Sequence, residues 1–135
     1  MQFELYQHKT ENCAYQQTRL LDQARDRLNA NKTLSALEEN GVLHSLQILI
    51  ENAIGKAKHL LKYNHIPVPA SAYDAFKLLM IQNIINQQQL SIWNTIIGLR
   101  NRIVYAYINI DIEQVLTLVK NNQYQHIRDF LYQKF

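Results

Sequence analysis

The sequence predicts a single all-α domain, an up-and-down bundle of four to six helices, on three observations. Leu, Ile, Gln, Asn and Lys fill long segments whose apolar residues recur at helical spacing. Only three glycines and two prolines occur, which leaves few turn-forming residues for an all-β design. The length of 135 residues suits one domain with its own core. We therefore expect residues 1–135 to form one domain, with short linkers that make successive helices antiparallel neighbours.

Composition narrows the class of protein further. The net charge of +3 and the pI near 9.0 are compatible with an anionic partner such as RNA, but they do not identify one. Cys13 is the only cysteine, so no intrachain disulfide is possible, and we interpret it as structural rather than nucleophilic. The first residues resemble no signal peptide, and no apolar run approaches the ~20 residues of a membrane helix. These features predict a cytoplasmic protein without a membrane segment.

The first helix is expected to begin near Asn12 and to end near Asn29. Residues 1–11 show no clear period and are expected to form an irregular lead-in. The apolar stripe of this helix is Leu21, Ala24 and Leu28, and its opposite side carries Arg19, Asp22, Asp26 and Arg27.

The second helix is expected to be the longest. Ser35 with Glu38 three residues later forms a capping-box pattern at its start. The prolines of residues 66–69 end it, because proline disfavours helical backbone in the residue before it. Its apolar face is wide enough to contact more than one neighbour. That face comprises Val42, Leu43, Leu46, Leu49, Ile50, Ala53, Ile54, Ala57, Leu60 and Leu61.

Four further segments complete the bundle. Ser71 is expected to cap a third helix, and residues 86–89 form a polar break. A fourth helix follows from about Gln88 to Tyr105 or slightly beyond. Asp111 is expected to be the N-cap of a fifth helix, and a short last helix follows the polar residues 121–123. The buried stripe of the third helix is expected to be Tyr73, Phe76, Leu79 and Met80. The residues that recur at helical spacing in the later helices are Trp93, Ile96, Ile97, Arg100, Val104 and Tyr107, then Ile112, Val115, Leu116 and Val119, and finally Ile127, Phe130 and Leu131.

Residues 98–107 concentrate the candidate chemistry of the chain. They read Gly-Leu-Arg-Asn-Arg-Ile-Val-Tyr-Ala-Tyr, with two arginines, an asparagine and two phenols in less than three helical turns. On an ideal helix Arg100 and Tyr107 are nearly aligned, whereas Tyr105 lies about 140° away from Arg100, on the face of Asn101 and Arg102. Arg100 and Tyr105 therefore meet only if the helix end unwinds, or if two copies face each other across a shared cleft. The second option predicts a symmetric homodimer whose arginines bind phosphate.

This stretch resembles the signature of the HEPN superfamily, specifically of the HepT-like toxins, which reads Arg-Asn-x-x-Val-His-x-Tyr. Arg100, Asn101, Val104 and Tyr107 match it, and Tyr105 stands where the family has His. The resemblance extends over residues 43–131, and it implies a HEPN-like bundle. It also implies a dimeric, metal-independent ribonuclease that uses the signature Arg and His and typically leaves cyclic phosphates.

Tyr105 weakens that implied mechanism. A histidine titrates near neutral pH and can move a proton to or from the RNA. An unperturbed phenol has a pKa of about 10, so it is a poor base at neutral pH, although it can donate a hydrogen bond to phosphate. We therefore expect weakened or absent nuclease activity, whether the substitution is natural or engineered.

The resemblance also implies a partner. HepT-like toxins of type VII toxin–antitoxin systems are paired with MntA, a nucleotidyltransferase antitoxin that transfers AMP from ATP to the tyrosine that ends the signature. That residue is Tyr107, and AMP groups there would block RNA phosphates by charge and bulk. A second hypothesis is a non-catalytic helical protein that serves as docking and modification target of such an enzyme. A helical adaptor unrelated to RNA is a third.

Each candidate also has an ordinary structural interpretation. The RNA-binding candidates are Arg100 and Arg102, and for Arg102 a solvated helix charge is the favoured interpretation. Asn101 either belongs to the catalytic set or caps the helix end. Tyr105 and Tyr107 suit an amphipathic core as well as a cleft. The five histidines, which are expected at the surface or its boundary, have no metal-ligand spacing, and the chain has no Gly-rich phosphate loop, so we expect no metal and no cofactor. They are His8, His44, His59, His65 and His126.

Overall fold

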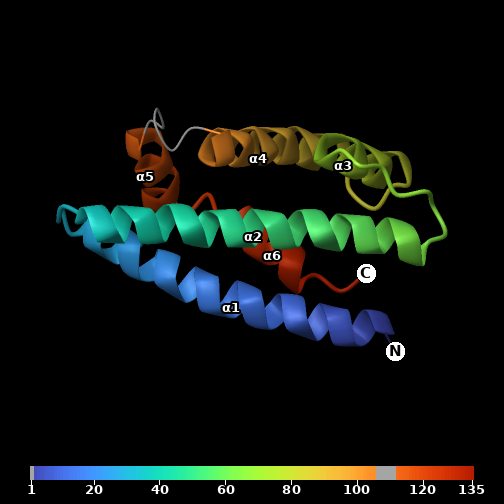
Figure 1. Ribbon diagram of the computed structural model, residues 1–135, viewed down its shortest axis with the longest axis horizontal. Helices are drawn as coiled ribbons and strands as arrows, with labels where there is room; N and C mark the ends of the chain where they lie inside the picture. The colour runs from blue at the N-terminus through green and yellow to red at the C-terminus, as the bar shows by residue number, and fades with distance from the viewer. Residues whose placement is uncertain (1, 106–111) are drawn as a thin grey trace.

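A computed structural model describes residues 2–105 and 112–135, and the described chain consists of helices and their connections. The all-α prediction is confirmed (Figure 1). The helices are α1 (Gln2–Asn29), α2 (Ala36–Tyr63), α3 (Ala72–Ile81), α4 (Gln87–Tyr105), α5 (Ile112–Lys120) and α6 (Gln125–Tyr132).

The bundle is organised around α2. The helices α1 and α2 form a long antiparallel pair, α3 and α4 lie along the other side of α2, and α6 packs against both α1 and α2 (Figure 1). The short α5 stands across the direction of the long helices and packs on α1. The prediction that the wide apolar face of α2 contacts more than one neighbour is therefore confirmed.

The expected irregular lead-in at residues 1–11 is wrong, because α1 already begins at Gln2. The buried positions of its first half recur at helical spacing, but several of them are polar. Gln7, Thr10 and Thr18 are buried beside Ala14, and Gln7 donates to the backbone oxygen of Leu131 at 2.9 Å. A search for apolar periodicity misses a helical face that buries amides and hydroxyls.

Side-chain caps define where three helices begin. Ser35 and Glu38 form the predicted capping box of α2, and Ser71 accepts from the backbone of Asp74 at the start of α3. A further reciprocal pair is present before α4. The backbone N–H of Gln89 donates to the side-chain oxygen of Asn86 at 2.7 Å, and the backbone N–H of Asn86 donates to the side-chain oxygen of Gln89 at 2.8 Å. Of the predicted polar break at residues 86–89, only Asn86 therefore precedes α4, and the other three residues form its first turn.

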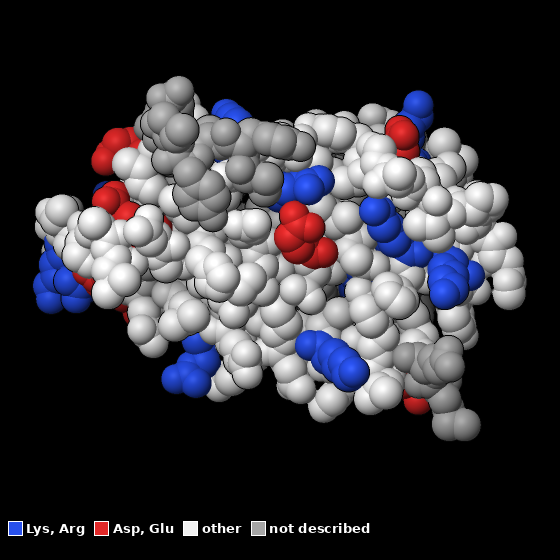
Figure 2. Space-filling model, viewed as in Figure 1, with Lys and Arg blue, Asp and Glu red and all other residues white. Residues whose placement is uncertain are grey.

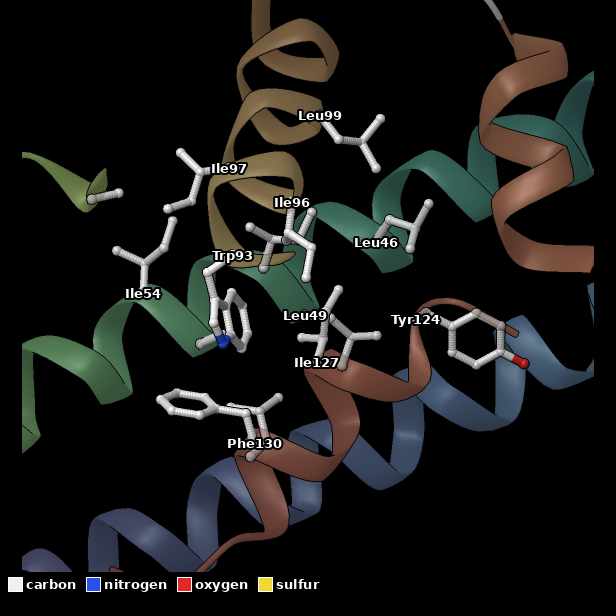
Figure 3. Packing of buried hydrophobic residues seen from close by; sticks show 14 of the residues in the cluster. Leu46, Leu49, Ile54, Trp93, Ile96, Ile97, Leu99, Tyr124, Ile127 and Phe130 are labelled. Atoms are coloured by element: carbon white, nitrogen blue, oxygen red, sulfur yellow. The ribbon is translucent and has the colours of Figure 1, made fainter. Parts of the chain in front are cut away.

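An aromatic cluster joins α3, α4 and α6 in the core, and Figure 3 shows its members Trp93 and Phe130. Phe76 stacks on Trp93 with ring centroids 4.4 Å apart, and Phe130 meets the Trp93 ring edge-on at 4.9 Å. Trp93 and its neighbour Ile96 are buried, as the sequence indicated. The prediction that Tyr73 belongs to the buried stripe of α3 is wrong, because its side chain is 40% exposed and small residues beside it, including Ala75, are buried instead.

Two buried polar contacts attach the C-terminal segment to the long helices. Lys56 of α2 is fully buried, and its Nζ donates to the backbone oxygens of Phe130 at 2.7 Å, Leu131 at 3.2 Å and Gln133 at 2.5 Å. The hydroxyl of buried Tyr124 donates to Asp22. Asp22 therefore faces α6, which corrects its expected place on the solvent side of α1. Among the described helices, none is both long and apolar enough to span a membrane.

Candidate functional site

The candidate site lies at the C-terminal end of α4, where packing against the core positions Arg100. Ile97, Leu99 and Ile103 are all buried, so this turn of α4 is fixed in rotation about its own axis. Arg100 lies between these anchors, and 24% of its side chain is exposed. The half-buried placement holds the guanidinium near the surface of the neighbouring helix, and this agrees with the expected helical stripe of α4.

Glu51 of α2 is the partner of Arg100. The Arg100 Nη1 lies 3.4 Å from Oε1 of Glu51, whose side chain is 46% exposed. This is a long, single contact in place of the paired hydrogen bonds that an arginine can make with a carboxylate. The Nε of Arg100 is buried and has no hydrogen-bond partner among the described residues. The guanidinium therefore keeps donor capacity that its intramolecular partner does not use.

The remaining signature residues are only partly described. Asn101 is half-buried and Arg102 is exposed on α4. The exposure of Arg102 agrees with its interpretation as a solvated helix charge. Tyr105 is the last residue of α4, and its side chain lies outside the described part of the structure, as do Tyr107 and Asp111 in full. The predicted roles of these three residues therefore stay predictions.

Charge on the visible face of the molecule is dispersed. Figure 2 shows Lys and Arg side chains scattered among uncharged residues, with neighbouring basic side chains over the C-terminal end of α2. A phosphate chain would therefore meet separate cations along this face instead of one continuous basic surface. The buried Nε of Arg100 distinguishes this residue from an ordinary solvated arginine.

The five histidines are exposed, which confirms their predicted surface placement. His44 is the one that shares a face of α2 with Glu51, since residues seven apart are nearly aligned on a helix. It lies about 10 Å along α2 from Glu51 at 1.5 Å per residue. Because α2 and α4 run antiparallel, this displacement is toward the end of α4 (Figure 1). An exposed histidine, His44, thus lies on α2 in the direction of the helix end that carries the signature.

Two other candidate chemistries find no support in the described residues. No three His, Cys, Asp or Glu side chains in residues 2–105 and 112–135 gather in a way that could hold a metal ion. Cys13 is half-buried, and burial raises the pKa of its thiol. A raised pKa reduces the thiolate fraction at neutral pH, which agrees with a structural role.

Comparison with known proteins identifies relatives over most of the chain. A family model described as "Ribonuclease HepT-like" matches residues 14–133. The mRNA nuclease HepT of Shewanella oneidensis is 29% identical over 92 residues. That match covers 68% of this chain and 66% of the nuclease, slightly less than two thirds of its length.

Solved structures show the same fold. A tri-AMPylated Shewanella oneidensis HEPN toxin in complex with MNT antitoxin aligns with a TM-score of 0.79 and 20% identity, covering 93% of each chain. A toxin–antitoxin structure with AMP-PNP aligns with a TM-score of 0.78 and 19% identity, covering 93% of this chain and 97% of the other. The predicted HEPN-like bundle is therefore confirmed.

Proposed function

Because the chain belongs to the family of HepT-like ribonucleases, we propose that it is the toxin subunit of a type VII toxin–antitoxin pair. In this proposal the active form is a homodimer that cleaves RNA without a metal ion, and an MntA-like nucleotidyltransferase neutralises it. The curated relative is an mRNA nuclease, and structural neighbours are toxins in complex with their antitoxins. RNA and a nucleotidyltransferase are thus the proposed partners.

The single observation that carries the proposal is the state of Arg100. Its guanidinium is half-buried, makes one long contact with Glu51, and has a buried Nε without a partner in the described chain. A phosphate is a better partner than this carboxylate, because it offers several oxygens for paired charge-assisted hydrogen bonds. Held there, the guanidinium would offset charge that grows on the phosphate oxygens during cleavage.

The proposed reaction needs a proton acceptor and a proton donor besides Arg100. The ribose 2′-oxygen attacks the phosphorus, the bond to the 5′-oxygen breaks, and a cyclic phosphate results. A base takes the 2′-OH proton and an acid protonates the leaving oxygen. Tyr105 stands where the family has the histidine suited to this work, so the proposed activity is weaker than in relatives with the full signature. Asn101 would orient groups at the same helix end.

Tyr107 is the proposed site of inactivation. AMP groups transferred from ATP to its hydroxyl would each add a negatively charged phosphate and a bulky nucleoside to the signature, seven residues along the chain from Arg100. The added charge would repel RNA phosphates and compete for the guanidinium. Arg102 is the further proposed RNA contact, because its side chain is exposed on α4 two residues after Arg100.

A non-catalytic docking and modification target is the second candidate. The observation that favours it is Tyr105 itself, because a phenol replaces the residue that moves the proton. In that case Tyr107 would still be modified by the nucleotidyltransferase, but no RNA would be cleaved.

One experiment separates the two candidates. The purified chain, Tyr105→His, Arg100→Ala and Tyr107→Phe are incubated with single-stranded RNA in EDTA, and products are analysed for cyclic phosphate ends. The toxin proposal expects slow cleavage by the native chain, faster cleavage by Tyr105→His and none by Arg100→Ala. Complete inactivity of both the native chain and Tyr105→His contradicts it and leaves the docking role.

A parallel incubation tests the modification. An MntA-type nucleotidyltransferase is added with ATP, and the intact mass of the product is measured. AMP-sized mass increments are expected on the native chain and on Arg100→Ala, which serves as the control for folding. Equal increments on Tyr107→Phe would rule out Tyr107 as the acceptor.

A further inference from the structure

A cavity lies where the start of α1 meets the C-terminal end of α2, away from the Arg100 contact. Its volume is about 570 Å³. The six residues that line it share a character, since each is either aromatic or basic and none of the described lining residues is acidic. They are Phe3, Tyr6, His59, Lys62, Tyr63 and His65, and we call them the aromatic–basic cleft.

The rings of this cleft contact one another in two pairs, one stacked and one tilted. Tyr6 and His59 stack with centroids 3.8 Å apart, and Phe3 and Tyr63 contact at 5.2 Å. Burial raises the pKa of Tyr6 to about 12, so its phenol stays neutral in the stack. Tyr63 is 64% exposed, which leaves its ring open to a planar ligand. Every nucleobase has a face that can stack on such a ring.

A cation stands beside the rings. Lys62 is exposed at the rim, one residue away from Tyr63, and His65 is exposed beside it. Burial and, to a smaller extent, the nearby Lys62 lower the pKa of His59, so its ring is neutral at pH 7 and Lys62 is the charged group of the lining. Rings for bases together with cations for phosphates are the features by which proteins hold single-stranded nucleic acid.

Helix geometry places Lys62, at the rim of the cleft, on the face of α2 that Arg100 contacts, while the ring of Tyr63 lies about 120° further round the helix. On α2, Glu51, Lys58 and Lys62 are separated by seven and four residues, so they occupy one face. Arg100 joins this face through its contact with Glu51, and Lys62 lies about 16 Å along the helix from that contact at 1.5 Å per residue. Figure 2 shows basic side chains over this end of α2. A short single strand could thus reach from Arg100 to the cleft.

We propose that the aromatic–basic cleft binds a single-stranded RNA segment a few nucleotides away from the phosphate held by Arg100, with a base on Tyr63 and a phosphate at Lys62. This inference rests on the proposed function, since it assigns part of the substrate to a second site. The occupant is RNA and not a protein, because an acid-free cationic lining next to an open ring complements a phosphate chain. Cleavage at Arg100 would then depend on RNA length.

Fluorescence anisotropy with labelled 2′-O-methyl single-stranded RNA, which cannot be cleaved, tests the proposal on the full chain. Tyr63→Ser and Lys62→Glu are each expected to weaken binding about tenfold, the scale of one lost stack. The matched controls are Tyr15→Ser, at a tyrosine of α1 that is 57% exposed, and Lys32→Glu at the opposite end of the long helices. Both controls are expected to bind like the native chain, and circular dichroism verifies folding of all four.

Crosslinking supplies a direct readout that does not depend on affinity. RNA carrying 5-iodouridine is irradiated with the native chain, and the modified peptide is identified by mass spectrometry. Crosslinks on the peptides that contain Tyr63 or Tyr6 support the cleft as an RNA site. If Tyr63→Ser and Lys62→Glu bind RNA as tightly as the native chain while Arg100→Ala loses binding, the cleft is not an RNA site, but the proposed function stands. If the native chain binds no RNA at all, the proposed function is wrong. If the cleft variants lose binding to the nucleotidyltransferase and keep binding to RNA, the cleft is a protein-binding surface and the inference is wrong.

Discussion

Arg100 of α4 and Glu51 of α2 form a long, half-exposed ion pair, with 3.4 Å between the guanidinium Nη1 and the carboxylate Oε1. Such a pair adds little to stability, because solvent screens it and two side chains must be ordered. Its larger effect is on ligand binding, since the carboxylate occupies part of the guanidinium and repels phosphate. The pair therefore restrains the one arginine on which the proposed reaction depends.

Replacing Glu51 by Gln tests this restraint. We expect RNA affinity to rise several-fold, while the free energy of unfolding changes by less than about 1 kcal/mol. Filter binding at two salt concentrations and urea denaturation measure the two quantities. Glu39→Gln, on the same helix and with the same charge change, is the control and should leave affinity at the native value. Unchanged affinity in Glu51→Gln would mean that the carboxylate does not compete with RNA.

Lys56 is expected to be the most sensitive charged position for stability. Its ammonium group supplies donors to three backbone oxygens of the C-terminal segment, which a methionine of similar shape cannot satisfy. Lys56→Met should lower the free energy of unfolding by about 2 kcal/mol, as expected when buried acceptors lose a charged donor. Chemical denaturation measures it, with exposed Lys9→Met as the control. A loss no larger than that of Lys9→Met would contradict the structural role of Lys56.

The same residue predicts a pH dependence. Burial lowers the pKa of Lys56 from 10.5 to about 8, and Glu11 opposes this with a smaller effect. Between these pH values the unfolded chain holds a proton that the folded protein has released. Raising the pH from 8 toward 10.5 therefore stabilises the folded state through this group. The stability difference between the native chain and Lys56→Met should widen across that window, and a constant difference would contradict it.

His44 provides a prediction about the missing proton carrier. It is exposed on the face of α2 that also bears Glu51, displaced toward the end of α4. If the native chain cleaves RNA, His44→Asn should reduce the rate at least tenfold, because positioned proton transfer contributes factors of about 100 or more. His126→Asn, another exposed histidine, should retain the native rate. Equal rates in both variants would exclude His44 as the base.

Helix order and class were predictable because they follow from local patterns. The capping box of Ser35 with Glu38, the prolines after α2 and the apolar stripe of α6 are all encoded within a few residues of where they act. The start of α1 was not predictable in this way. Its buried face uses Gln7 and Thr10, whose partners only exist once α1 has packed on the bundle.

The candidate site also has features that the sequence determined and features that depend on tertiary contacts. The sequence by itself determined the family signature around Arg100, including the phenol at position 105, because a signature is a property of spacing along one chain. Only the tertiary structure decided that Glu51 contacts Arg100, that Lys56 is enclosed, and that Tyr6 stacks on His59. Each of these contacts joins residues that are 49 to 77 positions apart in the sequence. Their meeting depends on how helices cross and rotate against one another, which no periodicity within a single helix specifies.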